Sequence, residues 1–185
     1  MKYKEFYKDI LTESTKPDFK KLGGDEWLEL REMETPTGPY TYSHEIRCDG
    51  KIISILPYRR AGRDAYEIGI REEITPCWGE SRSLSSVTGG VDKGEEPKAA
   101  AKRELFEETG YDVDISKIKE LGTCRGTKSS DTTYYLFGVD LTDAESPSKP
   151  EGDGTENDLA PLRWMYISDK IVDPLVYVSY QRLGL

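Results

Sequence analysis

The sequence predicts an α/β protein in which a mixed β-sheet carries few helices. Most of the apolar residues fall in short runs that are typical of strands. One segment, residues 97–109, is instead a long run of strong helix formers. The 185 residues are enough for one sizeable core, so we expect one main domain with a small appendage.

The N-terminal part of the chain predicts a helix followed by a β-hairpin. The helix is indicated by apolar residues at helical spacing, namely Tyr3, Phe6, Tyr7, Ile10 and Leu11. Pro17 and the pair Gly23-Gly24 then interrupt any regular pattern. Residues 27–33 and 40–46 read as the two strands of the hairpin.

Further strands are predicted along the rest of the chain, at residues 51–58, 66–74, 118–124, 132–141 and 162–167. Residues 77–82 read as a loop. Residues 144–160 are rich in Pro, Gly and acidic side chains and read as a mobile loop. The pattern of residues 175–183 allows either a helix or a strand.

The most informative feature is a helix rich in glutamate that lies between two glycine-containing segments. Pro97 suits its first turn, and Gly110 suits the position just past its end. Glu104, Glu107 and Glu108 are spaced i, i+3, i+4, so they share one face of the helix. Carboxylates so close repel one another, and a hard divalent cation such as Mg²⁺ or Mn²⁺ would turn that repulsion into affinity.

This stretch resembles the Nudix box, G-x5-E-x7-R-E-U-x-E-E-x-G-U, in which U is a bulky aliphatic residue. The positions that fit are Gly89, Glu95, Arg103, Glu104, Leu105, Glu107, Glu108 and Gly110. Only the last position departs, because Tyr111 stands where the family has an aliphatic residue. So many specified positions at fixed spacing make the signal specific.

The resemblance implies a Nudix-type α/β/α sandwich with a central mixed sheet. It assigns residues 48–185 to the Nudix hydrolase domain and residues 1–47 to a helix-and-hairpin extension. Such an extension is similar to the one through which Nudix ADP-ribose pyrophosphatases form dimers. Two alternatives stay open for this hairpin: it could form a homodimer, or it could only cover the core.

The resemblance also implies a metal site. Glu104, Glu107 and Glu108 match the metal-binding glutamates of the family, and the backbone carbonyl of Thr88 or Gly89 would join them. The cofactor is then Mg²⁺, with Mn²⁺ as a substitute. Such an ion neutralises charge on a diphosphate while an activated water attacks phosphorus.

Other residues of the motif are expected to act through their neighbours. Glu95 is the expected partner of Arg103, which should point away from the glutamate face and help to fix the ligands. Gly89 and Gly110 are motif residues that shape the loop and end the helix. For the general base the resemblance offers Glu104 or the loop residue Glu156, for which an ordinary solvated charge is the alternative.

Cations outside the motif are candidates for binding the phosphates, and these are Arg71, Arg82, Arg125 and Lys128. Each is also compatible with an ordinary surface charge. Trp78 and Tyr134 have rings that could stack on a base or simply fill the core.

The expected substrate is a nucleoside diphosphate linked to another group, with ADP-ribose or a nucleotide sugar first. The segment from Val87 to Glu95 resembles one common in enzymes of that kind, although Val87 replaces their proline. Dinucleoside polyphosphates, NADH and capped RNA are alternatives, because fold and motif do not set specificity. A nucleotide sensor without hydrolysis is a further alternative, and an isomerase on this fold is disfavoured because His44 is the only histidine.

The composition restricts the classes of binding partner and the cellular compartment that we expect. A net charge of -9 argues against a duplex nucleic-acid binder but not against a small nucleotide held with a metal ion. No apolar run is long enough to span a membrane, and no secretory signal is seen. The three cysteines lack metal-like spacing, so we expect a cytoplasmic protein.

Overall fold

The computed structural model describes residues 18–79, 82–145, 147–148 and 162–185. They form two β-sheets, of three and seven strands, together with two α-helices and two short 3-10 helices. The helix expected near the N-terminus and the candidate base Glu156 lie outside the described residues. No helix in the described ranges is long and apolar enough to cross a membrane.

The small sheet contains the expected hairpin and one strand more. The hairpin consists of β2 (Leu28–Thr35) and β3 (Gly38–Glu45), which pair antiparallel as predicted. An additional strand, β1 (Lys20–Gly24), pairs antiparallel with β2. The expectation that Gly23 and Gly24 break all regular structure is therefore wrong, because pairing with β2 holds this segment extended, with a register shift between Lys21 and Gly23.

The large sheet has the strand order β10-β5-β4-β9-β8, with β6 paired to β5 and β7 paired to β4. Its strands are β4 (Lys51–Arg60), β5 (Tyr66–Glu73), β6 (Ser83–Ser85), β7 (Val87–Gly90), β8 (Ile118–Cys124), β9 (Thr133–Asp140) and β10 (Leu162–Met165). Only β4 and β9 pair parallel, and the other pairs are antiparallel, so the sheet is mixed as predicted.

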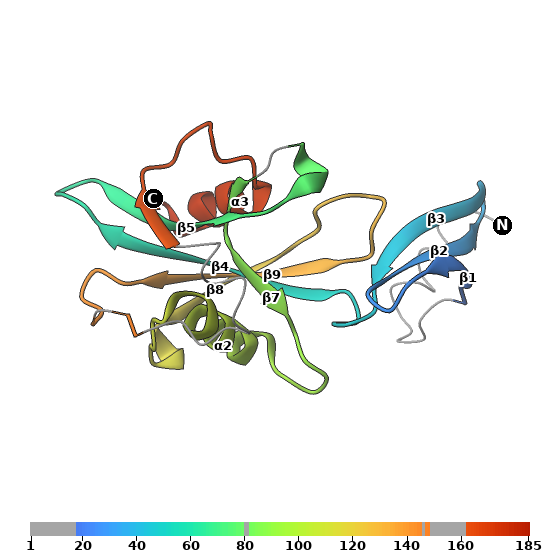
Figure 1. The fold of residues 1–185 in the computed structure, drawn as a ribbon, viewed down its shortest axis with the longest axis horizontal. Helices are drawn as coiled ribbons and strands as arrows, with labels where there is room; N and C mark the ends of the chain where they lie inside the picture. The colour runs from blue at the N-terminus through green and yellow to red at the C-terminus, as the bar shows by residue number, and fades with distance from the viewer. Residues whose placement is uncertain (1–17, 80–81, 146, 149–161) are drawn as a thin grey trace.

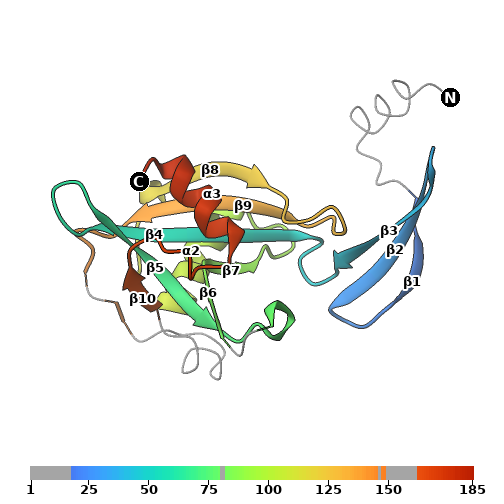
Figure 2. The same ribbon diagram turned by 90° about the horizontal axis from the view of Figure 1, so that it is seen from above.

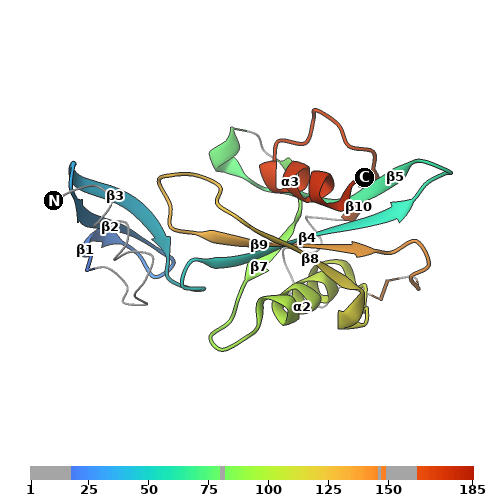
Figure 3. The same ribbon diagram turned by 180° about the vertical axis from the view of Figure 1, so that it is seen from behind.

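The two α-helices cover opposite faces of the large sheet (Figures 1 and 3). They are α2 (Pro97–Thr109) and α3 (Pro174–Leu183), and the second resolves the open choice for the C-terminal segment in favour of a helix. Figure 2 shows α3 lying across β4 and β9. The short helices η1 (Pro76–Trp78) and η2 (Ile115–Lys117) lie in connections. The arrangement is the expected α/β/α sandwich.

The strand β4 forms the centre of the core because its side chains point alternately to the two faces. Ile53 and Ile55 are fully buried in the cluster that contains Ala100, Ala101 and Leu105 of α2. Leu56 is fully buried on the other side, in the cluster with Val176 of α3. Two apolar layers on one strand explain why this segment reads as a nearly continuous apolar run.

The small sheet lies at one end of the sandwich and contacts the loop between β8 and β9 (Figure 1). The backbone N–H of Ser43 donates to the carbonyl of Ser129 at 2.8 Å. His44, which is buried, lies 2.9 Å from Asp131 through Nδ1. These contacts join the two sheets, but the predicted division into domains at residue 47 stays a prediction.

Candidate active site

The helix that carries the glutamates begins and ends where its sequence predicts. Pro97 is its first residue, and Gly110 follows its last residue in the left-handed conformation, with φ 74°. The N–H of Gly110 donates to the carbonyl of Phe106 at 2.8 Å, which ends the helix. Glu104, Glu107 and Glu108 thus lie on the C-terminal half of α2, which packs against β7 and β4.

Gly89 brings the strand β7 into direct contact with the carboxylate of Glu104. A Cβ atom at residue 89 would lie 1.9 Å from Glu104 Cδ and 2.0 Å from Oε1. A side chain there would have to displace the carboxylate of Glu104, so glycine is favoured by this close approach and not by backbone conformation. The side chain of Glu104 is 12% exposed, and this burial raises its pKa above the ordinary value of 4.5, against the opposing influence of Arg103.

Arg103 links the glycine loop to the helix. Its Nε and Nη2 donate to the two oxygens of Glu95 at 3.1 and 2.9 Å, as expected for this pair. Its Nη1 also donates to Glu104 at 2.7 Å and to Glu107 at 3.0 Å, and Nη2 donates to the carbonyl of Gly90 at 3.0 Å. The expectation that Arg103 points away from the glutamates is therefore wrong, because its long side chain bends back across the turn.

Glu108 has a different partner. Its carboxylate pairs with the guanidinium of Arg71, a residue of β5 whose side chain is 5% exposed. Arg71 Nη1 also lies 3.0 Å from Glu73 Oε1 on the same strand. Arg71 was expected at a strand end facing the phosphates, yet the structure buries it beneath α2 between two carboxylates.

The chemistry of the glutamates fits a hard divalent cation, since all three offer carboxylate oxygens and that of Glu104 lies against the backbone of Gly89. In the described ranges, however, no three His, Cys, Asp or Glu side chains are grouped as metal ligands. Arg103 and Arg71 instead balance their charge. The predicted metal site thus stays a prediction. Of the three glutamates, Glu107 has the most exposed side chain, at 36%.

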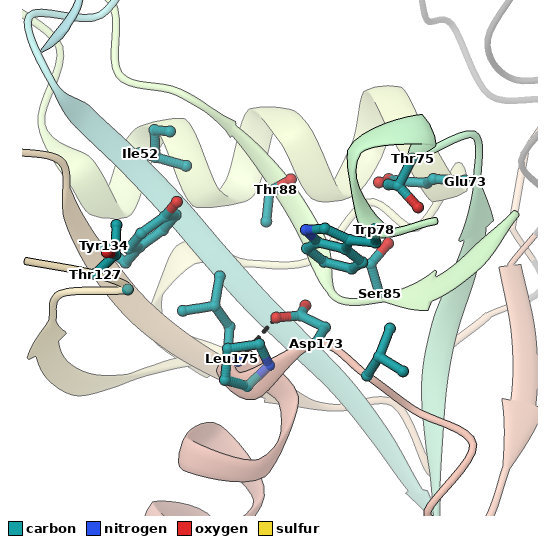
Figure 4. A pocket seen from close by; sticks show the side chains of 13 residues that line it. Ile52, Glu73, Thr75, Trp78, Ser85, Thr88, Thr127, Tyr134, Asp173 and Leu175 are labelled. Carbon is teal, nitrogen blue, oxygen red and sulfur yellow. Dashed lines mark hydrogen bonds between the residues drawn. The ribbon is translucent and has the colours of Figure 1, made fainter. Parts of the chain in front are cut away.

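A pocket of about 490 Å³ borders the same strands on the α3 side of the sheet (Figure 4). Thr88 of β7 and Glu73 of β5 line it, so it adjoins the residues next to Gly89 and Arg71. Trp78 stands at one end and Tyr134 at the other. The volume and aromatic walls suit a planar organic group.

Two buried polar residues of this pocket were not predicted from the sequence. Ser85 is 4% exposed, and its hydroxyl has no hydrogen-bond partner in the described part of the chain. Asp173 is 2% exposed and accepts hydrogen bonds from the N–H and hydroxyl of Ser86 and from the N–H of Leu175. The sequence Asp173-Pro174 is a helix-start signal that could have identified Asp173, whereas nothing distinguishes Ser85 among its neighbouring serines.

The other predicted cations do not gather at this pocket. Arg125 and Lys128 line a second pocket of about 430 Å³ between the small sheet and the loop before β9. Arg82 is partly buried and precedes β6. Within the described residues, none of the four candidate cations lines the pocket of Figure 4. Trp78 and Tyr134 do line it, and the ring of Trp78 is 44% exposed.

A model of the NUDIX domain matches residues 58–176, which is more than half of the chain. The chain belongs to the Nudix family. The match includes the whole glutamate helix and most of the large sheet.

Individual Nudix relatives share shorter stretches. A putative 8-oxo-dGTP diphosphatase of Bacillus subtilis (strain 168) is 36% identical over 97 residues, or 52% of this chain and 54% of that protein. An RNA pyrophosphohydrolase of Roseobacter denitrificans is 57% identical over 30 residues, or 16% of this chain and 19% of that protein. The chain thus spans about half, or less, of the length of these curated relatives.

The crystal structure of an ADP compounds hydrolase is similar over nearly the whole chain. It superposes with a TM-score of 0.65, covering 94% of this chain and 95% of that one, at 17% sequence identity. At that identity the likeness establishes the Nudix fold.

Proposed function

We propose that this Nudix protein is a Mg²⁺-dependent pyrophosphohydrolase that cleaves the diphosphate linkage of a nucleoside diphosphate joined to another group. ADP-ribose or a nucleotide sugar is the proposed substrate class. The observation that carries the proposal is the contact with Glu104 that Gly89 makes from the strand β7, in which the preceding residue, Thr88, lines a pocket with aromatic walls. A diphosphate at the glycine loop would have glutamate oxygens on one side and a pocket for its organic end on the other.

In this proposal, some residues bind the metal ion and others orient those that bind it. Glu104, Glu107 and Glu108 would hold Mg²⁺, with the carbonyl of Thr88 or Gly89 beside them. The ion would supply positive charge to the diphosphate and to the leaving phosphate. Arg103 holds Glu104 and Glu107 toward the loop through its bond to Glu95, which supports a role in keeping the carboxylates in place.

The pocket would bind the base of the nucleotide. Trp78, exposed at one end, offers a face on which a planar ring can stack. The hydroxyl of Ser85 can donate or accept one hydrogen bond from the edge of that ring. The pocket is thus suited to a heteroaromatic group and poorly suited to a free sugar.

We propose Glu104 or Glu156 as the general base that takes a proton from the attacking water. The position of Glu104 against Gly89 of the glycine loop, where the diphosphate would bind, supports this residue. Glu156→Gln with normal kinetics would assign the role to Glu104. A large fall in kcat at unchanged KM would assign it to Glu156.

The proposal is tested by a phosphate-release screen with Mg²⁺ and with Mn²⁺ over ADP-ribose, nucleotide sugars, NADH, dinucleoside polyphosphates, 8-oxo-dGTP and 5′-triphosphorylated and capped RNA. Metal-dependent cleavage of ADP-ribose or a nucleotide sugar is expected. Cleavage of only another class would correct the substrate. Nucleotide binding without cleavage of any compound would identify a sensor instead.

A single substitution tests the proposed role of the helix. Glu108→Gln should lose metal-dependent turnover by a factor of about 100 or more while the fold is kept, because a neutral amide is a poor ligand for Mg²⁺. Glu120→Gln is the matched control, since Glu120 is 68% exposed and pairs only with Lys98 among the described residues. Equal activity of the two variants would refute the site.

We also propose that the small sheet forms a homodimer. Large apolar side chains at its surface support this, since Trp27 is 57%, Leu28 47% and Leu30 44% exposed. Light scattering after size-exclusion chromatography should give twice the chain mass. Leu28→Lys with Leu30→Lys should give the monomer, and a monomeric wild-type protein would refute the proposal.

A further inference from the structure

Arg71 is held on two sides by carboxylates that come from different parts of the site. One is Glu108 of α2, and the other is Glu73, which lines the pocket of Figure 4. The side chain of Arg71 is 5% exposed, that of Glu108 13% and that of Glu73 24%. A guanidinium in such a place is rigid, because leaving either carboxylate would cost the free energy of an unpaired buried charge.

This environment differs from that of an arginine that binds substrate. Arg71 does not line the pocket, and its Nη1 is directed to both Glu73 and Glu108. One guanidinium nitrogen thus bridges the two carboxylates, which ties the position of Glu108 to that of Glu73. What it fixes is one of the three glutamates of the helix.

We propose that Arg71 is a positioning residue that holds the carboxylate of Glu108 ready for a divalent cation, with Glu73 as the anchor of its guanidinium. The inference rests on the proposed function, because it assigns Glu108 to the cation. It also means that the wall of the pocket and the glutamate helix share one guanidinium. The carboxylate of Glu108 would then already be oriented before the cation binds.

Two effects oppose each other when the charge of Arg71 is removed. A positive charge beside three glutamates repels a cation, so its loss alone would make cation binding tighter. Loss of the orienting contact makes binding weaker, and groups that orient metal ligands typically contribute 10- to 100-fold in affinity. The sign of the change in Kd therefore separates a positioning residue from a simple counter-charge.

The experiment is calorimetric titration of the full chain with Mn²⁺ alone, followed by thermal unfolding of each variant. We expect Arg71→Met to raise the Kd for Mn²⁺ by a factor of about 10 to 100. Arg71→Lys should raise it nearly as much, because an ammonium keeps the charge but not the planar guanidinium geometry that bridges Glu73 and Glu108. A Kd equal to or below that of the wild type in either variant would overturn the inference.

A milder variant keeps the test decisive if Arg71 variants fail to fold. Glu73→Gln retains the shape of the anchor without its charge, and Glu73 is the more exposed of the two carboxylates. We expect its Kd for Mn²⁺ to rise by a factor of about 3 to 10, a fraction of the full orienting effect. An unchanged Kd would overturn the inference in that case.

Arg59→Met is the matched control. Arg59 lies on the neighbouring strand β4, pairs with Glu67 at 2.7 Å and lies over the ring of Trp164, with no ion pair to Glu104, Glu107 or Glu108 within the described residues. Its loss removes an arginine–glutamate pair of the same sheet, so the Kd for Mn²⁺ should stay within a factor of about 2. A wild-type protein that binds no Mn²⁺ would refute the proposed metal site itself, which is a different outcome from equal binding by the variants.

Discussion

At the scale of single residues, the absence of a side chain at residue 89 matters most for the site. The carboxylate of Glu104 occupies the space that a Cβ there would take. A larger residue would not strain the backbone of β7, because Gly89 has no positive φ. It would instead displace the flexible end of Glu104, so the effect should fall on chemistry more than on folding.

Gly89→Ala should therefore abolish most of the hydrolysis, by a factor of about 100 or more, while the midpoint of thermal unfolding moves little. The measurements are kcat/KM for the substrate found in the screen and a thermal melt. Gly23→Ala is the control, because no atom lies within 4 Å of a Cβ there and its φ is not positive. An active Gly89→Ala enzyme would contradict the proposed role of Glu104.

Ser85 allows a second prediction at this scale. Its buried hydroxyl lacks a partner in the described residues, so Ser85→Ala should leave stability unchanged or raise it by about 1 kcal/mol. If the hydroxyl bonds the substrate, KM should rise about 5- to 10-fold, the equivalent of one hydrogen bond. Steady-state kinetics and urea unfolding measure the two effects.

Ser179→Ala is the control for that prediction. Its hydroxyl is also buried without a partner in the described residues, but it lies in α3 and does not line the pocket. Its KM should match that of the wild type. A rise in KM in both variants would mean that the effect arises from packing and not from contact with the substrate.

At the scale of elements, the bond between Arg103 and Glu95 joins the glycine loop to the helix α2. The hydrogen bonds from Arg103 lower the pKa of Glu95 below its ordinary value of 4.5. A carboxyl with a lowered folded-state pKa stabilises the fold above its unfolded-state pKa, and this contribution is lost as the pH falls through the folded-state pKa.

Glu95→Gln should thus lower the free energy of unfolding by about 1.5 to 3 kcal/mol at pH 7, the contribution of hydrogen bonds to a charged group. The difference from the wild type should shrink as the pH falls below about 4.5. Urea unfolding at pH 7 and at pH 3 measures it. Glu120→Gln should show no difference at either pH, and a pH-independent loss in Glu95→Gln would contradict the ionic origin.

The elements that the sequence predicted well are those whose signals are local. Pro97 and Gly110 mark the ends of α2, and the alternating or continuous apolar runs mark β4 and β8. The strand β1 was missed because only its pairing with β2 holds the two glycines extended. Local propensity contains no information about such a partner.

The candidate site was predicted in part, for a similar reason. The motif identified Glu104 and its neighbours by spacing, and the bond of Arg103 to Glu95 followed from the resemblance. The environment of Arg71 depends on Glu108 of α2 reaching β5, and that of Ser85 depends on the pocket that it lines together with Thr88 and Asp173. Contacts between distant elements of this kind are set by packing and leave no local pattern in the sequence.

At the scale of the whole molecule, the two sheets meet through the loop between β8 and β9. The two carboxylate oxygens of Asp131 lie 2.9 and 3.1 Å from Nδ1 of His44 in β3. Arg125 donates a hydrogen bond to the backbone carbonyl of Asp131 at 2.8 Å. Asp131 is therefore one of the residues that join the small sheet to this loop, together with the bond from Ser43 to Ser129. The same loop borders both pockets.

Asp131→Ala should loosen the small sheet without unfolding the sandwich. Amide hydrogens of β2 and β3 should exchange about 10-fold faster or more, since a lost hydrogen-bonded partner of a buried group costs about 1 to 3 kcal/mol. Amides of β4 should exchange as in the wild type. Hydrogen exchange measured by mass spectrometry tests this prediction, and the exposed Asp169→Ala is the control. Equally faster exchange in both sheets would contradict the idea that the small sheet can loosen independently of the large one.

The parallel pairing of β4 with β9 also governs when this protein can fold as it is synthesised. β4 is complete at Arg60, but the strand that fills its parallel edge begins at Thr133. At ribosomal speeds of about 5 to 20 residues per second, roughly 4 to 15 seconds separate the two. Throughout that interval Ile53 and Ile55 lack β9, and α2 is complete only once Thr109 has been added. The nascent chain is therefore open to chaperones and to aggregation until β9 has been made.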